Sequence, residues 1–355
     1  MAIEDGDAPT VAEIESLSDL YGIDADTLGD QPITVAAQDS LGVLALLDEF
    51  RDVSAESRAR IIGAARAARD AVELATLLGE PSGLAALRKR RRAPPPTPHE
   101  KTAPWSEGVH YAKWWRKELG LGRGPVPSMR DLLTDQFPEV MVIHADLGDP
   151  SVSGLTFADP LRGPTIVLNV FGKNESPLVR RFSLAHELAH LLVAFPRAEP
   201  LATLSGFRED ARLAVEQRAN AFAVRFLCPE SELKALAREE KPKAAADILG
   251  RRWGLHFEAA RLYLDRVAHV EVPRSPLPSS LAVHALWGSS EDRGLEPFPL
   301  QDVPPERRTE VARRAALAYS SGVISRDRCA RLLGVTPADE IERLLSFFSL
   351  DVPEE

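Results

Sequence analysis

The stretch RFSLAHELAHLL, residues 181–192, decides the fold of the region around it. Its leucines recur every three or four residues, which is the spacing that places side chains on one face of a helix. We therefore predict a helix from 178 to 193 whose leucine face points into a core. The leucines of that face are Leu184, Leu188, Leu191 and Leu192.

The same helix presents two histidines to one side. An α-helix turns once in about 3.6 residues, so His186 and His190 share a face and their imidazoles can bind one metal ion. Glu187 follows the first histidine, where its carboxylate is placed to take a proton from the attacking water. Zinc lowers the pKa of a bound water to about 7, so this HExxH pattern predicts a zinc site with Glu187 as general base.

A catalytic zinc usually has three protein ligands, so a further ligand must come from elsewhere in the chain. The metzincin pattern is excluded, because it needs Gly and His where this sequence has Val193 and Pro196. A glutamate on the next helix, predicted from 209 to 226, is the other common solution. Glu216 is the leading candidate, since Asn220 follows one turn later and can orient a histidine ligand. The alternatives that remain open are Glu209, Asp210 and Glu230.

Apolar segments before the helix predict strands at 140–143, 154–157 and 165–169. The last is rich in β-branched residues, and a substrate strand could pair along it by β-augmentation. Helices are expected around Trp114 and Trp115, from 128 to 137, and as a helix–turn–helix from 243 to 268. The fold class expected is α+β, a mainly helical domain with a small antiparallel or mixed sheet, flanked by helical N- and C-terminal segments.

Composition narrows the class of protein. The chain has 355 residues, 44% of them hydrophobic, which is enough for two or three domains. Its net charge of −10 argues against a nucleic-acid coat. Two cysteines, Cys228 and Cys329, fit a reducing compartment, and no signal peptide or membrane span is recognisable. We therefore expect a cytoplasmic protein with no membrane association.

Shifts in composition suggest how the chain is divided. The basic run Arg88–Arg92 and the prolines after it predict a linker, because prolines stiffen a chain and cannot continue a helix. The expected order is a helical N-terminal region at 1–87, the linker at 88–103, a zinc peptidase domain at 104–270, an irregular linker at 271–303 and a small helical module at 304–355.

Taken together, several spaced segments resemble the ImmA/IrrE family of metallopeptidases. They are residues 181–192, EQRANAFA at 216–223, LCP at 227–229, WRKELGLG at 115–122, IVLN at 166–169 and the helix–turn–helix at 249–264. The resemblance implies a zincin-like, gluzincin-type domain that binds Zn²⁺. Carried over onto this chain, the zinc ligands are His186, His190 and Glu216, the general base is Glu187, and Asn220 supports the ligands.

The resemblance also implies a function. Members of the family cut or inactivate helix-turn-helix repressors of the Xre type, so we expect an endopeptidase that relieves repression in a mobile element or a stress response. The alternative is a non-proteolytic antirepressor or antitoxin-like protein that uses the fold as a binding scaffold. Residues 18–28 resemble the end of an Xre-type domain, but only a short acidic stretch precedes them. For that reason we do not expect DNA binding.

Overall fold

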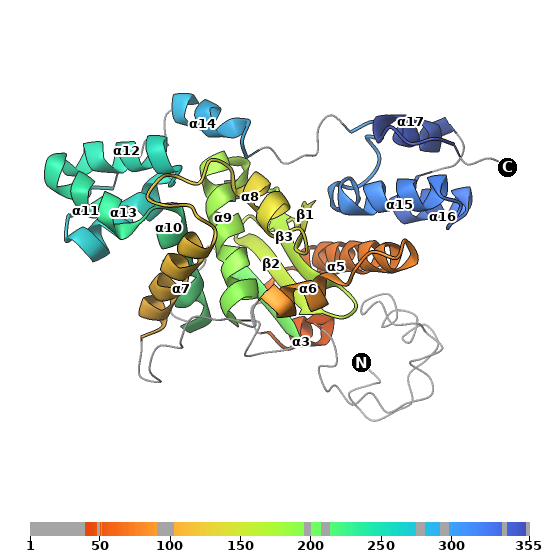
Figure 1. Cartoon of the computed structure of the whole chain (residues 1–355), viewed down its shortest axis with the longest axis horizontal. Helices are drawn as coiled ribbons and strands as arrows, with labels where there is room; N and C mark the ends of the chain where they lie inside the picture. Colours follow the sequence, from red (N-terminus) through yellow and green to blue (C-terminus); the bar gives the residue numbers. More distant parts are fainter. Residues whose placement is uncertain are drawn as a thin grey trace.

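A computed structural model of the chain describes residues 40–47, 50, 52–90, 103–194, 200–206, 214–274, 281–291, 298–335 and 339–352. A four-stranded mixed sheet lies at its centre (Figure 1). The strands are β1 (Met141–Ala145), β2 (Val152–Asp159), β3 (Gly163–Asn169) and β4 (Leu201–Gly206), in the order β1-β3-β2-β4. β3 pairs in parallel with β1 and antiparallel with β2, and β4 pairs antiparallel with β2.

The helices that surround the histidine motif share one hydrophobic core with one face of the sheet, and the last three of them lie farthest from it (Figure 1). These are α7 (Pro104–Glu118), α8 (Met129–Gln136), α9 (Pro177–Ala189), α10 (Ala214–Leu227), α11 (Glu230–Glu239), α12 (Pro242–Trp253) and α13 (Phe257–Ala268). The 3-10 turn η2 (Gly172–Glu175) precedes α9, and the π-helical turn η3 (His190–Ala194) follows it. The expected α+β architecture, mainly helical with a small mixed sheet, is confirmed.

The other face of the sheet packs against helices from both ends of the chain. They are α3 (Ser40–Leu46), α5 (Ala55–Leu77), η5 (Pro305–Arg307), α15 (Glu310–Ser320), α16 (Arg326–Leu333) and α17 (Asp339–Phe347). Leu155 and Phe157 of β2 point to this side, whereas Thr156 between them points to α9. Buried alanines on α5 and α15, such as Ala68 and Ala315, are small enough to let the two helices approach closely.

Two of the expected linkers contain helices. α6 (Gly83–Arg90) continues into the basic run, because Leu84 and Leu87 are buried in the core and Arg90 forms an ion pair with Glu139. Its basic residues fall in the last turn, where the helix dipole favours positive charge. α14 (Leu281–Gly288) lies within the segment expected to be irregular. Residues 91–102 lie outside the described chain, as do 18–28, and the division into domains remains a prediction.

Asp159, at the end of β2, joins three segments on the second face. Its carboxylate accepts hydrogen bonds from the backbone N–H of Ser40 at 2.7 Å and of Arg162 at 2.7 Å, and it forms an ion pair of 3.1 Å with the Arg162 guanidinium. Burial alone would raise the pKa of Asp159, but the hydrogen bonds from Ser40 and the charge of Arg162 lower it below its usual value. The buried carboxylate is therefore charged and stabilising at neutral pH.

None of the described helices has both the length and the apolar character that crossing a membrane requires.

Candidate functional site

The helix α9 holds the motif through its leucine face. Pro177 occupies its first turn, where the missing N–H costs nothing, and the helix then runs without interruption to Ala189. The four leucines predicted to face the core are all buried there: Leu184, Leu188, Leu191 and Leu192. His190 begins the π-helical turn that ends the helix. The histidines project toward the sheet and toward α10.

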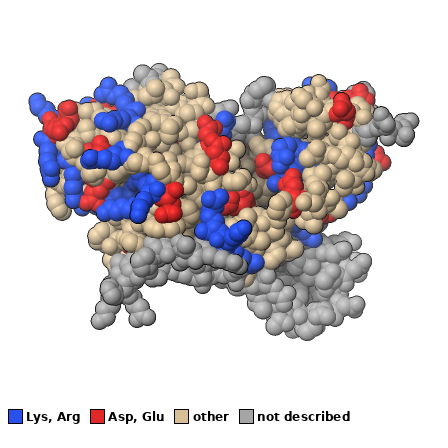
Figure 2. Space-filling model, viewed as in Figure 1, with Lys and Arg blue, Asp and Glu red and all other residues tan. Residues whose placement is uncertain are grey.

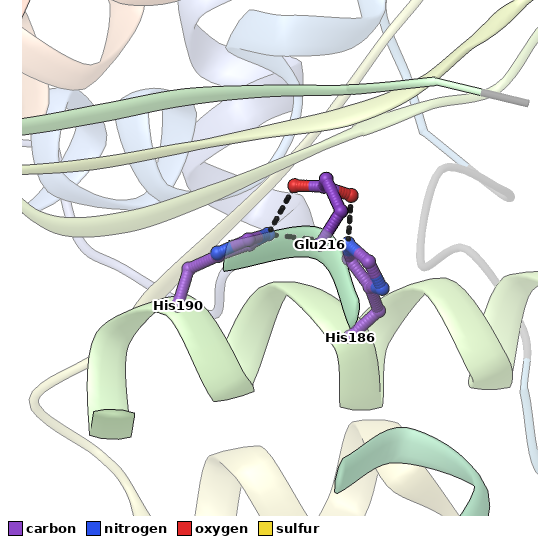
Figure 3. A group of neighbouring side chains, drawn as sticks. All are labelled: His186, His190 and Glu216. Carbon is purple, nitrogen blue, oxygen red and sulfur yellow. Dashed lines mark hydrogen bonds and ion pairs between the residues drawn. The ribbon is translucent and has the colours of Figure 1, made fainter. Parts of the chain in front are cut away.

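Glu216 from the first turn of α10 meets both histidines (Figure 3). Its carboxylate oxygens lie 3.1 Å from His186 Nε2 and 3.3 Å from His190 Nε2, and the two Nε2 atoms are 3.1 Å apart. All three side chains are buried. In the described part of the chain these residues form the one group of His, Cys, Asp or Glu side chains whose ligand atoms are close enough to hold a metal ion.

The spacing of these atoms fits a tetrahedral metal ion. With zinc–ligand bonds of about 2.0–2.1 Å, neighbouring ligand atoms in a tetrahedron lie about 3.3 Å apart, close to the three separations observed. Burial alone would lower the pKa of His186, but the charge of Glu216 raises it to about 9. The histidines in turn hold the pKa of Glu216 well below its usual value. A carboxylate that attracts positive charge between two imidazoles is a suitable setting for a divalent cation.

Asn220 fixes the tautomer of the first histidine. Its Oδ1 lies 3.2 Å from His186 Nδ1, so this nitrogen donates its proton to the amide oxygen. Nε2, the nitrogen that faces Glu216 and His190, is then the one whose lone pair a metal ion would use. Asn220 lies one turn after Glu216 on α10, which is the position predicted for a residue that orients a histidine.

Glu187 lies beside this group, fully buried beneath the sheet. Its Oε2 accepts a hydrogen bond of 2.8 Å from the Thr156 hydroxyl, while its Oε1 has no hydrogen-bond partner in the described chain. Gly154, two residues earlier on β2, makes room for the carboxylate, because a Cβ there would stand 3.0 Å from Oε1 and 2.7 Å from the backbone oxygen of Val167. The sequence does not identify Thr156 or Gly154 as site residues, since their role depends on the pairing of β2.

The strand β4 completes the site and was not predicted. Its Ser205 hydroxyl lies 3.3 Å from His190 Nε2. The strand expected to receive a substrate, 165–169, is β3, which is paired on both sides, so its backbone is unavailable for β-augmentation. β4 instead pairs only with β2 among the described strands. It escaped prediction because it is short and follows Pro200, and because its polar residues are those that face the site.

Other candidates from the sequence lie elsewhere or have structural partners. Glu230 forms an ion pair with Lys234, and Glu209 and Asp210 lie outside the described chain. The Tyr263 hydroxyl donates to the backbone oxygen of Cys228 at 3.1 Å, so it has a structural partner. His256 caps α13 by accepting from the Ala259 N–H, and burial lowers its pKa to about 4.

The segment 281–291 holds α9 from the side away from the sheet. Glu291 forms a 2.8 Å ion pair with Arg181, and both side chains are fully buried. The ring of Trp287 in α14 covers the same guanidinium at 4.0 Å. Residues far along the chain therefore fix the helix that carries His186 and His190.

Comparison with known proteins agrees with this geometry. Residues 138–264 match the Peptidase M78 family model, described as the IrrE N-terminal-like domain. The match begins just before β1 and ends within α13, so it includes the whole sheet, α9 and α10. No curated protein matches the chain. The resemblance predicted from the sequence is confirmed over residues 138–264, which are similar to the IrrE N-terminal-like domain of the ImmA/IrrE peptidases.

Proposed function

We propose that this protein is a zinc-dependent endopeptidase with His186, His190 and Glu216 as its metal ligands and Glu187 as its general base. The observation that carries the proposal is the convergence of three buried ligand atoms beside a carboxylate oxygen that has no partner among the described residues. Two imidazoles and a carboxylate form one of the ligand sets that catalytic zinc prefers.

Each residue of the site has a distinct task in peptide hydrolysis. When bound, zinc supplies Lewis acidity that polarises the scissile carbonyl and acidifies the attacking water. Glu187 accepts the proton of that water at Oε1, while Thr156 holds Oε2 at 2.8 Å and so fixes the direction of the carboxylate. Asn220 keeps His186 in the tautomer that can bind a cation. The buried setting strengthens each of these interactions, because the local dielectric is low.

The edge of β4 that pairs with no strand in the described chain supports a mode of substrate binding. An extended peptide that paired along this edge would pass Ser205, whose hydroxyl is 3.3 Å from His190 Nε2. Main-chain pairing accepts many sequences, so selectivity would come from side-chain contacts on either side of the cut bond. We propose β4 as the strand that aligns the substrate.

The proposed substrate is a helix-turn-helix repressor of the Xre type, and the support for it is the family resemblance. Cleavage would release the genes that the repressor holds silent. Cytoplasmic action agrees with the two cysteines being free and buried, because free thiols persist in a reducing compartment.

The deciding experiment coexpresses the chain with the Xre-type repressor encoded nearest to its gene. The native chain should shorten the repressor, seen as a fragment on a gel and by mass spectrometry. Glu187→Gln should abolish the fragment while metal analysis still finds about one zinc per chain, because the ligands are untouched. The matched control is Glu175→Gln, an exposed glutamate just before α9, which should cleave normally.

Other outcomes of this experiment separate the alternatives. Relief of repression by Glu187→Gln without cleavage would favour the antirepressor, in which the fold acts as a binding scaffold. A metal content near zero in the native chain after reconstitution with zinc would overturn the ligand assignment. Salt-dependent binding to duplex DNA would reopen a DNA-binding role. Figure 2 shows Lys and Arg gathered over the α11–α13 end, but with Asp and Glu among them, so that surface is of mixed charge.

A further inference from the structure

A cavity of about 420 Å³ lies on the face of the molecule opposite the metal site. Its walls come from α5, η5 and α16, the helices that pack on the second face of the sheet (Figure 1). The residues that line it are Asp70, Arg307, Ser325, Arg328, Arg331 and Leu332. This volume is in the range of pockets that hold small molecules, which begins at about 300 Å³.

The side chains that line the cavity carry more positive than negative charge. Three arginines line it and one aspartate, so the lining carries an excess of positive charge. Arg307 Nη1 contacts the carboxylate of Asp70 at 2.8 Å, and Arg328 contacts Glu73, which does not line the cavity. Arg307 Nη1 also donates to the backbone oxygen of Leu332. Each of these guanidiniums has five N–H donors, so these contacts leave donors for a ligand.

Arg331 is the unsatisfied member of the group. Its side chain is exposed and has no hydrogen bond or ion pair within the described chain. The hydroxyl of Ser325, which caps α16 by accepting from the backbone N–H of Arg328 at 3.2 Å, adds a polar group to the same wall. The start of α16 also contributes the partial positive charge of a helix N-terminus, so several features of this wall favour an anion.

We propose that this cavity binds a small molecule that carries one or two phosphate groups. The planar guanidinium fork matches phosphate oxygens with paired hydrogen bonds, and three forks that line one pocket can converge on a compact dianion. A nucleic-acid backbone would need cations along an extended path, whereas these three arginines line a single pocket. The bound anion would contact Arg307 of η5 together with Arg328 and Arg331 of α16, and so would hold these two elements together.

The test is isothermal titration calorimetry of the full chain with inorganic pyrophosphate and, separately, inorganic phosphate. We expect one saturable pyrophosphate site with a dissociation constant below about 1 mM. Arg331→Ala should weaken it about tenfold or more, because a charge-assisted contact is lost. Arg331 has no ion pair in the described chain, so this change leaves the fold intact. The matched control is Arg251→Ala, which removes an exposed arginine of α12 outside the cavity and should bind as the native chain does.

Further arms identify the source of the phosphate and exclude the metal site. Saturating pyrophosphate should raise the melting temperature of the native chain and not of Arg331→Ala, because ligand binding stabilises the folded state only. ADP should compete with pyrophosphate if the natural ligand is a nucleotide. The proposal is overturned if pyrophosphate shows no saturable binding up to about 10 mM, if Arg331→Ala and Arg251→Ala weaken it equally, or if Arg331→Ala weakens duplex DNA binding alone. Pyrophosphate binding that persists in Arg331→Ala but disappears when a chelator is added would assign the anion to the metal site. That result would also overturn the proposal.

Discussion

Replacing Glu291 with alanine should destabilise the protein by about 3–5 kcal/mol, because it leaves a buried guanidinium without its carboxylate. Glu291 Oε1 accepts from Arg181 Nη1 at 2.8 Å and from the backbone N–H of Met129, at the start of α8, also at 2.8 Å. Burial lowers the pKa of Arg181 to about 10, which still leaves the guanidinium charged at neutral pH. The positive charge therefore remains when its partner is removed.

Two further groups bear on this magnitude. Arg181 keeps a hydrogen bond of 2.7 Å to the backbone oxygen of Val126 and the ring of Trp287 at 4.0 Å, and these contacts cancel in the comparison because the native chain has them too. The Met129 N–H loses its acceptor, which costs about 1 kcal/mol or more in a buried position, so the loss should lie in the upper part of the range.

Urea unfolding at pH 7, followed by circular dichroism, measures the loss. Glu291→Gln should cost less than Glu291→Ala, because the amide oxygen can still accept from Met129. The control is Glu342→Ala, which breaks an exposed ion pair of 3.5 Å to Arg326 and should change the free energy of unfolding by about 0.5 kcal/mol or less. If Glu291→Ala costs no more than this control, the segment 281–291 does not hold α9 and the reasoning fails.

The remaining predictions concern the site and one buried carboxylate. Gly154→Ala should lower peptidase activity and the free energy of unfolding, the latter by about 1–3 kcal/mol, because the new methyl group displaces the Glu187 carboxylate. The zinc content should stay normal. Unchanged activity would show that this carboxylate has room to move. Asn220→Ala should weaken zinc affinity about 10–100-fold in competition with a chelator, since His186 loses its orienting partner, and equal affinity would remove Asn220 from the site. Asp159→Asn should make the free energy of unfolding depend less on pH in acidic solution. The pKa of Asp159 is lowered in the folded chain, so the stability that its charge contributes is complete above the unfolded pKa of about 3.9 and is lost as the pH falls through the folded pKa. Urea midpoints measured between about pH 3 and pH 7 test this. Parallel curves of midpoint against pH for the variant and the native chain would contradict it.

Local sequence signals predicted most of the peptidase fold. The strands at 140–143, 154–157 and 165–169 correspond to β1, β2 and β3, and the helix expected from 178 to 193 corresponds to α9 with its π-helical turn. These segments are strongly patterned because each buries one or both faces in a core. The short edge strand β4 is different: it is half polar, and only its pairing with β2 makes it a strand.

The site was predictable where its members share a helix or a motif. His186 and His190 are fixed relative to each other by helix geometry alone, and Glu216 was weighed against several carboxylates that the spacing could not eliminate. Thr156 could not be identified, because its contact with Glu187 requires the tertiary packing of β2 on α9. The ion pair between Glu291 and Arg181 could not be predicted either, because the two residues are far apart in the sequence and neither belongs to a recognisable pattern.

The hydrogen bonding of the buried Glu187 carboxylate distinguishes a catalytic role of the site from a purely scaffolding one. A zinc ion that only supports a fold usually has four protein ligands and a closed shell, whereas three donors converge here in the described chain. Next to them, a fully buried carboxylate is held by one hydroxyl and leaves its other oxygen without a partner among the described residues. An unsatisfied buried acceptor costs about 1–3 kcal/mol, and β2 must carry glycine at 154 to admit it. A scaffold gains nothing from that cost, because an alanine or a leucine at 187 would pack beneath the sheet more favourably. A base that must receive a proton from water needs such a free oxygen, so the arrangement favours hydrolysis.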